Sequence, residues 1–264
     1  MSFFEALILG LVQGLTEFLP VSSSGHIELG AHFLNVSNAD NLLFSIVVHG
    51  ATALSTIIIF RKYIGELIKD VLKFKWNDST VFVVKIVISM IPVAIVGILF
   101  EDAITALFTG QILFVAGMLS ITGILLLLTH FSPSREKDVS YIHSFVVGLS
   151  QAAAILPGIS RSGATIATAL LLGVDKNQAA RFSFLMVLPP ILGAMILKAL
   201  DFAGTSQSAA TVPVVALVTG FTTAFIAGLV ACQWMINLVK RGKLLYFAIY
   251  CFTISISVII LTII

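Results

Sequence analysis

The sequence predicts an all-α integral membrane protein with six transmembrane helices and two re-entrant helix pairs, arranged as an inverted repeat. Composition is the first observation behind this prediction. Hydrophobic residues make up 58% of the 264 residues, charged residues make up 11%, and the mean hydropathy is +1.09. Such a chain has too few polar side chains to cover a soluble globule of its size. The other observations are long apolar runs and two apolar stretches that are broken by proline.

Six apolar runs are close to the ~20 residues that a helix needs to cross the hydrocarbon core. These predicted spans are 43–60, 81–100, 111–129, 182–200, 213–235 and 246–264. Cys232 lies in the apolar run 213–235, and Cys251 lies in the apolar run 246–264. This location predicts buried free thiols and argues against a disulfide or a zinc site.

Positively charged side chains divide the connections between the spans into two groups. Lysine or arginine occurs in the connections 61–80, 130–143, 173–181 and 236–245. Neither occurs in the connections 30–42, 101–110 and 201–212. The positive-inside rule therefore places the first group in the cytoplasm and the second outside. The 61–80 connection also has apolar residues at helical spacing with lysines between them, which predicts an amphipathic helix on the anionic cytoplasmic leaflet.

Two further stretches, 1–40 and 144–172, cannot cross the membrane, because the six spans use all the alternations between the two sides. We expect each to be a re-entrant helix pair, the first entering from outside and the second from the cytoplasm. Irregular backbone at membrane depth is tolerated only where it is buried in protein or lines a wet cavity. Both chain termini would then be external.

The two broken stretches also repeat each other at a fixed spacing. A shift of 138 residues superimposes Gly10, Gln13, Ser22, Ser24 and Gly25 on Gly148, Gln151, Ser160, Ser162 and Gly163. Pro20 and Pro157 are one residue out of register. The pattern predicts a single membrane domain, 1–264, with one repeat at about 1–130 and another at about 144–264. Each repeat has an odd number of crossings, so the two are inverted, and broken helices at matching positions indicate a site at the repeat interface.

Polar side chains gather at the two breaks. The first break contains Glu17, Ser22, Ser23, Ser24 and His26, and the second contains Ser160, Arg161, Ser162 and Thr165. Charged groups at mid-membrane face a partner or an aqueous cavity, because exposure to lipid is costly. Serines after a break are typical N-caps, and two helix N-termini beside an arginine favour binding of a phosphate or pyrophosphate. The simpler alternatives are serines that only cap helices, a His26 that only hydrogen-bonds between helices, and an arginine that only pairs with Glu17.

These residues resemble the signature segments of a known family. The segments QGLTEFLPVSSSGH at 13–26, PGISRSGAT at 157–165 and RFSFLM at 181–186 are similar to those of the undecaprenyl-pyrophosphate phosphatase family, also called the bacitracin-resistance family. The resemblance covers essentially the whole chain. It implies a multi-pass enzyme of the bacterial inner membrane that removes the terminal phosphate of undecaprenyl pyrophosphate. This reaction recycles the lipid carrier of peptidoglycan and other wall polymers and gives bacitracin resistance.

The resemblance also implies the site residues. Catalytic roles fall on Glu17, Ser23, His26 and Arg161, and phosphate binding falls on Ser22, Ser24, Ser160, Arg161, Ser162 and Thr165. The family's dependence on Mg²⁺ or Ca²⁺ implies a divalent cation, with Glu17 and Gln13 as candidate ligands. Gln13 stands where many members have glutamate, which leaves Glu17 as the one carboxylate of the motif.

Three nucleophiles remain open at this stage. Ser23 activated by His26 three residues away is the first, a phosphohistidine at His26 is the second, and a water activated by His26 or Glu17 is the third. Arg161 and the helix amides would offset the charge that develops on the transferred phosphoryl group.

Two other functions compete with this prediction. Inverted repeats with broken helices are also typical of transporters, so the alternative is a transporter or flippase of a phosphorylated lipid. The type-2 phosphatidic acid phosphatase superfamily is discounted, because Arg161 is followed by no histidine at the distance that its signature requires. The expected partners are a prenyl pyrophosphate lipid and the membrane, without nucleic acid, and a homodimer is left open. We expect the active cavity to face outward, where the pyrophosphate carrier is released after polymer transfer.

Overall fold

The computed structural model describes residues 1–36, 38–100, 107, 111–132, 136–204 and 212–263. The regular elements in these ranges are α-helices, with one isolated bridge between Lys137 and Val174. The helices are α1 (Phe3–Thr16), α2 (Ser23–Phe33), α3 (Asn38–Ile59), α4 (Arg61–Val71), α5 (Asp78–Leu99), α7 (Ile112–His130), α8 (Tyr141–Ala153), α9 (Arg161–Leu171), α10 (Lys176–Met186), α11 (Leu188–Gly204), α12 (Val214–Lys240) and α13 (Leu245–Ile263). The predicted all-α class is confirmed over the described part of the chain.

Five helices are long and apolar enough to cross a membrane, and a bent pair can supply a sixth crossing. The five are Asp78–Leu99, Ile112–His130, Lys176–Leu197, Val214–Lys240 and Leu245–Ile263, and the bent pair is Leu43–Ile59 with Arg61–Val71. Each matches one of the six predicted apolar runs. The chain is therefore a multi-pass membrane protein by the length and composition of its helices.

Several helices begin or end at other residues than the predicted segments. The span predicted at 182–200 begins instead at Lys176, because Asp175 caps this helix by accepting from the backbone N–H groups of Asn177 and Gln178. Hydrophobicity alone did not reveal this polar first turn. Helix α3 begins at Asn38, inside the stretch that was predicted to form the first re-entrant pair.

Other boundaries extend beyond the predicted runs. Helix α12 continues to Lys240, five residues past the predicted end of its span. Helix α8 begins at Tyr141, where Ser140 and His143 form a capping box. The predicted external connections 101–110 and 201–212 lie largely outside the described residues.

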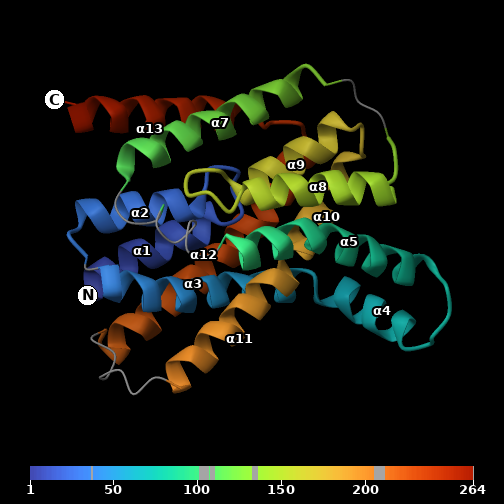
Figure 1. Cartoon of the computed structure of the whole chain (residues 1–264), viewed down its shortest axis with the longest axis horizontal. Coiled ribbons are helices and arrows are strands. Elements are labelled where there is room, and N and C mark those ends of the chain that lie inside the picture. Colours follow the sequence, from blue (N-terminus) through green and yellow to red (C-terminus); the bar gives the residue numbers. More distant parts are fainter. Residues whose placement is uncertain (37, 101–106, 108–110, 133–135, 205–211, 264) are drawn as a thin grey trace.

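The predicted amphipathic helix is confirmed over Arg61–Val71, where α4 turns away from α3 by 76°. One face of α4 packs on the protein through Leu67, which is buried, while Ile68 and Leu72 are exposed. The helix is shorter than the predicted 61–80, since it ends at Val71 and the chain turns at Phe74, which has φ 52°, before α5 begins at Asp78. Figure 1 shows α4 at the end of the molecule opposite the two chain termini.

The two broken stretches form two short helix pairs. In Figure 1, α1 and α2 lie at the end that carries both termini, and α8 and α9 lie toward the opposite end. The breaks between the paired helices meet inside the molecule. A β-carbon on Gly25 would lie 3.2 Å from Cα of Gly158, and one on Gly163 would lie 3.3 Å from Cβ of Pro20. The absence of a side chain at these glycines lets the two breaks touch.

Small residues also allow the helices that carry the breaks to pack closely on their neighbours. Helix α1 packs on α12, and helix α8 packs on α5. A β-carbon on Gly10 would lie 2.7 Å from the carbonyl oxygen of Gly220, and one on Gly148 would lie 2.4 Å from that of Ser89. Such backbone approach is typical of helix contacts in membranes. Both cysteines are buried and free, as predicted.

Candidate functional site

The serines after each break cap the helices that follow them. Ser22 is the N-cap of α2, and its Oγ accepts from the backbone N–H of Gly25 at 3.2 Å. Ser160 is the N-cap of α9, and its Oγ accepts from the backbone N–H of Gly163 at 3.0 Å. The predicted caps are therefore confirmed. In each case the serine two residues further on lies beside the cap, with Oγ–Oγ distances of 3.4 Å for Ser24 and 3.3 Å for Ser162.

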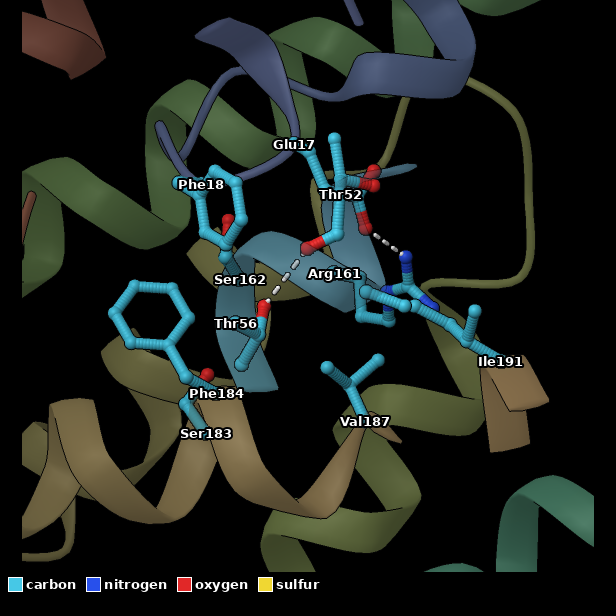
Figure 2. A pocket seen from close by; sticks show the side chains of 11 residues that line it. Glu17, Phe18, Thr52, Thr56, Arg161, Ser162, Ser183, Phe184, Val187 and Ile191 are labelled. Carbon is cyan, nitrogen blue, oxygen red and sulfur yellow. Dashed lines mark hydrogen bonds and ion pairs between the residues drawn. The ribbon is translucent and has the colours of Figure 1, made fainter. Parts of the chain in front are cut away.

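An ion pair connects the two breaks. Glu17 is the C-cap of α1, and Arg161 is the first residue of α9. Arg161 Nη2 donates to Glu17 Oε1, as Figure 2 shows. The Glu17 side chain is 7% exposed and the Arg161 side chain is 29% exposed. Because the guanidinium has several N–H donors in a planar fork, one bond to Glu17 leaves donors for a second acceptor.

The other carboxylate oxygen of Glu17 collects three polar side chains. Ser23 Oγ donates to Glu17 Oε2 at 2.6 Å, and Gln13 Nε2 donates to the same atom at 2.9 Å. His49 Nε2, on α3, lies 3.7 Å from it. Ser23 is thus paired with Glu17, which is placed to accept its proton.

His26 lies outside this network. Its Nδ1 is 2.8 Å from the carbonyl oxygen of Ser22, and its Nε2 is 2.9 Å from the hydroxyl of Tyr250. The structure therefore does not bring His26 into hydrogen-bonding contact with Ser23 or Glu17. Ser23 and His26 are both in the first turn of α2, but the imidazole of His26 points toward Tyr250 on α13.

Ser162 and Thr165 take different places on α9. Ser162 Oγ donates to the carbonyl oxygen of Leu19 at 3.3 Å, so it adds a further contact between the two breaks. Thr165 is buried, and its Oγ1 donates to the carbonyl oxygen of Arg161 at 2.8 Å. The same hydroxyl lies 2.5 Å from Ser183 Oγ. Thr165 therefore supports the turn that carries Arg161, and it does not line the pocket described next.

A pocket with about 350 Å³ of empty space, including part of its open mouth, adjoins the ion pair. Figure 2 shows Glu17 and Arg161 on one side of it and the apolar side chains of Phe18, Phe184 and Val187 around the rest. Thr52 and Thr56 of α3 also line the wall. A charged end beside an apolar wall suits a molecule with an anionic head and a hydrocarbon tail.

The residues around Glu17 have the oxygen donors for a sparse cation site. Gln13 Oε1 is buried and has no hydrogen-bond partner in the described structure, although Gln13 Nε2 is bonded to Glu17. Among the described residues, no group of three or more His, Cys, Asp and Glu side chains is placed to hold a metal ion. Magnesium commonly keeps several waters and takes further ligands from substrate phosphates. Gln13 Oε1 and the Glu17 carboxylate are thus the candidate protein ligands, with Glu17 Oε1 already accepting from Arg161 and Oε2 accepting from Ser23 and Gln13.

Comparison with known proteins assigns the chain to a family. The sequence model of the family described as Bacitracin resistance protein BacA matches residues 6–257. This chain belongs to that family. An undecaprenyl-diphosphatase of Christiangramia forsetii is 55% identical over 262 residues, which is 98% of each chain. One of Bacteroides thetaiotaomicron is 50% identical over 261 residues, covering 98% of this chain and 99% of the relative. One of Methanococcus vannielii is 41% identical, with 97% and 98% covered.

Several residues at the site of this BacA-family protein were not predicted as site residues. They are His49, Thr52, Thr56, Ser183 and Tyr250. All lie on long apolar segments, where sequence alone does not tell which face meets the breaks. One signal was available for Ser183, because Phe182-Ser183 repeats Phe44-Ser45 at the same spacing as the two broken stretches.

Proposed function

We propose that this protein is an undecaprenyl-diphosphatase, which hydrolyses undecaprenyl pyrophosphate to undecaprenyl phosphate and inorganic phosphate. The proposal includes the recycling of the lipid carrier for wall-polymer synthesis and a contribution to bacitracin resistance. Relatives of this name match the chain over nearly its full length. The observation that carries the proposal is the group formed by Glu17, Ser23 and Arg161 where the two breaks meet.

In the proposed complex, the diphosphate lies at the starts of α2 and α9. The first N–H groups of a helix lack partners within the helix and carry the positive end of its dipole, so they bind anions. Both helices have 11 residues. Arg161 adds a full positive charge in the first turn of α9, and its remaining N–H donors bind phosphate oxygens. Ser24 is next to the cap of α2 and donates to the same oxygens, and Ser162 would join it by exchanging its hydrogen bond to Leu19 for one to the phosphate.

We propose Ser23 as the nucleophile and Glu17 as its base. Ser23 Oγ attacks the terminal phosphorus while its proton passes to Glu17 Oε2, the atom 2.6 Å away. The bond between this phosphorus and the bridging oxygen breaks, and undecaprenyl phosphate leaves. Water then hydrolyses the phosphoserine, and the proton on Glu17 returns to Ser23 Oγ. Arg161 offsets the negative charge on the transferred group in both steps.

We also propose that the apolar part of the pocket receives the first units of the prenyl chain. Phe18, Phe184, Val187 and Ile191 line that part. Apolar contact with these side chains would hold the lipid while the charged end fixes the diphosphate. The rest of a long prenyl chain would remain in the bilayer, because the pocket is too small to enclose it.

A divalent cation is part of the proposal. Gln13 Oε1 and the carboxylate of Glu17 would hold it. When bound, Mg²⁺ or Ca²⁺ would neutralise charge on the phosphates. Gln13 has a second role that does not depend on the cation, since its Nε2 fixes the orientation of the Glu17 carboxylate.

The proposed architecture is an inverted repeat with two re-entrant pairs and six spans. Contacts at equivalent positions support it. The contact between Gly25 and Gly158 becomes that between Gly163 and Pro20 when each residue is replaced by its counterpart 138 positions away. In the same way, α1 against α12 corresponds to α8 against α5. We further propose that the protein lies in the inner membrane with its active cavity outward, on the basis of the lysines and arginines in the alternate connections.

An assay of phosphate release by the purified protein tests this proposal. The substrates are prenyl pyrophosphates of several chain lengths, and each is assayed with and without a chelator. We expect release by the unsubstituted protein, a large loss in Arg161→Ala and in Glu17→Gln, and a loss with chelator that Mg²⁺ restores. Full phosphate release by Arg161→Ala would contradict the proposed mechanism. If lipid moved across proteoliposome membranes without any phosphate release, the transport alternative would replace the phosphatase.

A further inference from the structure

His49 on α3 faces the carboxylate of Glu17. Its Nε2 lies 3.7 Å from Glu17 Oε2, and Ser23 Oγ donates to the same oxygen at 2.6 Å. The other ring nitrogen, Nδ1, lies 2.7 Å from the carbonyl oxygen of Ser45. Because a carbonyl oxygen only accepts hydrogen bonds, Nδ1 carries a proton. In the neutral ring, the nitrogen with the lone pair is then Nε2, the one that faces Glu17.

The distance between His49 and Glu17 indicates a neutral imidazole. A protonated Nε2–H beside a carboxylate closes to a charge-assisted hydrogen bond of about 2.7–2.9 Å. Ser23 Oγ and Gln13 Nε2 already donate to Glu17 Oε2, at 2.6 Å and 2.9 Å. These two donors occupy both lone-pair directions of the oxygen, so the lone pair of Nε2 stays beyond hydrogen-bonding distance.

The first step of the proposed reaction turns Glu17 Oε2 from an acceptor into a donor. When Ser23 Oγ attacks phosphorus, its proton moves to Oε2, and the new O–H group needs an acceptor. Ser23 Oγ is then bonded to phosphorus, and Gln13 Nε2 carries only N–H donors. Of the three side chains gathered at Oε2, His49 supplies the acceptor. Catalytic hydrogen bonds are often long before the substrate binds, and Nε2 has to approach by about 0.5–1 Å to make this one.

The second repeat supports a link between Glu17 and His49. The shift of 138 residues that superimposes the two breaks places Ile155 at the position of Glu17 and Val187 at the position of His49. Two neighbouring polar residues keep identical counterparts at this shift, namely Gln151 for Gln13 and Ser183 for Ser45. The carboxylate and the imidazole are therefore present together in one repeat and replaced together in the other.

We propose that His49 is a positioning residue that accepts a hydrogen bond from protonated Glu17. The inference rests on the proposed phosphatase function and its pairing of Ser23 with Glu17. In the first step, the proton of Ser23 Oγ passes to Glu17 Oε2 as the new oxygen–phosphorus bond forms and undecaprenyl phosphate leaves. Nε2 of His49 accepts from the new O–H group, while Nδ1–H stays on the carbonyl oxygen of Ser45. In the second step, this proton returns to Ser23 Oγ, and the inorganic phosphate carries away both protons of the water. His49 itself neither gains nor loses a proton.

Three substitutions at His49 distinguish a hydrogen-bond acceptor from a positive charge. His49→Leu removes both, His49→Gln keeps an acceptor oxygen without a charge, and His49→Lys keeps a charge without an acceptor. His130→Leu is the control for the loss of a histidine, because His130 is exposed at the end of α7 with its ring against Phe131. Thermal unfolding of each variant checks the fold, and His49→Ala replaces His49→Leu if the latter does not fold.

Two measurements on the purified protein test the proposal. The first is the rate at which a fluorophosphonate labels Ser23, followed by mass spectrometry of the peptide. In this reaction Ser23 Oγ displaces fluoride from phosphorus and its proton passes to Glu17, as in the first step of the proposed mechanism. The second measurement is the kcat and KM of phosphate release from a prenyl pyrophosphate.

The expected changes follow from the loss of one hydrogen bond. In His49→Leu and His49→Lys, both the labelling rate and kcat should fall about tenfold. His49→Gln should lose about threefold, because its amide oxygen still accepts from Glu17. KM should change little in all three variants, and His130→Leu should match the unsubstituted protein.

The labelling rate separates this inference from the proposed function. Equal labelling of Ser23 in His49→Leu and in the unsubstituted protein would overturn the inference, and so would equal losses in His49→Gln and His49→Leu. A higher labelling rate in His49→Lys than in His49→Gln would make His49 a positive charge at the site and would also overturn it. Absence of label on Ser23 of the unsubstituted protein would remove the pairing of Ser23 with Glu17, and the inference with it. If Ser23 were labelled but no phosphate were released, the proposed function would fail, and the labelling rates would still decide the inference.

Discussion

Glu17 and Arg161 are 144 residues apart in the sequence, and their side chains form an ion pair that connects the two breaks. Removal of one partner of a buried ion pair leaves the other charge unpaired, at a cost of about 3–5 kcal/mol in fully buried cases. Arg161 is partly exposed, so the cost here should be smaller. The same pair places the carboxylate beside Ser23 and the guanidinium beside the pocket. Substitutions at either residue therefore have to be measured for both stability and activity.

Arg161→Ala should lower kcat/KM of phosphate release by about 10²–10³-fold, because preorganised positive charge at the transferred group is lost. Arg161→Lys keeps the charge but loses the planar fork, so its kcat/KM should lie between those of Arg161→Ala and the unsubstituted protein. Arg61→Ala is the control, since Arg61 is exposed at the start of α4 and its guanidinium donates to the carbonyl oxygen of Ile58 at the end of α3. A kcat/KM of Arg161→Ala similar to that of the control would exclude a catalytic role for the guanidinium.

Ser23→Ala should abolish phosphate release to within the background, whereas Ser24→Ala should lose about tenfold or less, as expected for one phosphate contact. The difference follows from geometry, because Ser23 Oγ is bonded to Glu17 while Ser24 Oγ lies beside Ser22. Steady-state assays of the two variants check this prediction. In a second experiment, brief acid quenching of the unsubstituted protein should trap a phosphoserine. Substantial activity in Ser23→Ala would favour water or His26 as the nucleophile.

Gln13→Glu should make the enzyme bind Mg²⁺ more tightly. The substitution places a second carboxylate next to Glu17, and a divalent cation would offset the repulsion between the two. We expect the Mg²⁺ concentration for half-maximal activity to fall by about tenfold, and activity without added metal to decrease. Gln13→Leu, which has no oxygen ligand, is the comparison. Equal Mg²⁺ dependence in all three proteins would remove Gln13 from the cation site.

Gly10→Ala should destabilise the fold by about 1–3 kcal/mol, because its β-carbon would lie 2.7 Å from the carbonyl oxygen of Gly220. Gly117→Ala provides the matched control on α7, where an added β-carbon meets nothing within 4 Å. There the better helix propensity of alanine should stabilise by about 0.5–1 kcal/mol. Thermal unfolding in detergent measures both. If the two variants unfolded at the same temperature, close packing of α1 on α12 would not matter for stability.

Ser23→Cys should react with an impermeant thiol reagent from outside intact cells. The experiment requires a background in which the buried Cys232 and Cys251 are replaced by alanine. The same reagent applied to the Cys-free protein gives the blank, and Lys73→Cys, at an exposed position in the connection proposed to be cytoplasmic, gives the internal marker. Reaction of Ser23→Cys only after permeabilisation would place the cavity on the cytoplasmic side instead.

Much of this protein could be predicted from local chemistry in the sequence. The apolar runs identified the helices that can cross a membrane, since the bilayer sets the length of a span. Pro20 and the serines after it marked the first break, and a serine N-cap was correctly expected after each break, although the caps are Ser22 and Ser160, two residues before the predicted helix starts at about Ser24 and Ser162. A cap depends only on the residues within one turn of the helix start. The polar beginning of α10 was missed for the opposite reason, because a search for apolar residues does not detect a capped polar turn.

The sequence alone determined a multi-pass helical protein with two polar breaks rich in serine and an arginine suited to phosphate. Only the tertiary structure decided which of these side chains are partners. It paired Ser23 with Glu17 and turned His26 toward Tyr250, although spacing along the chain made Ser23 and His26 the natural couple. Spacing restricts residues to one face of a helix, whereas the direction of a side chain depends on which neighbouring helix packs there. Those neighbours come from distant parts of the chain, as Tyr250 and Arg161 do.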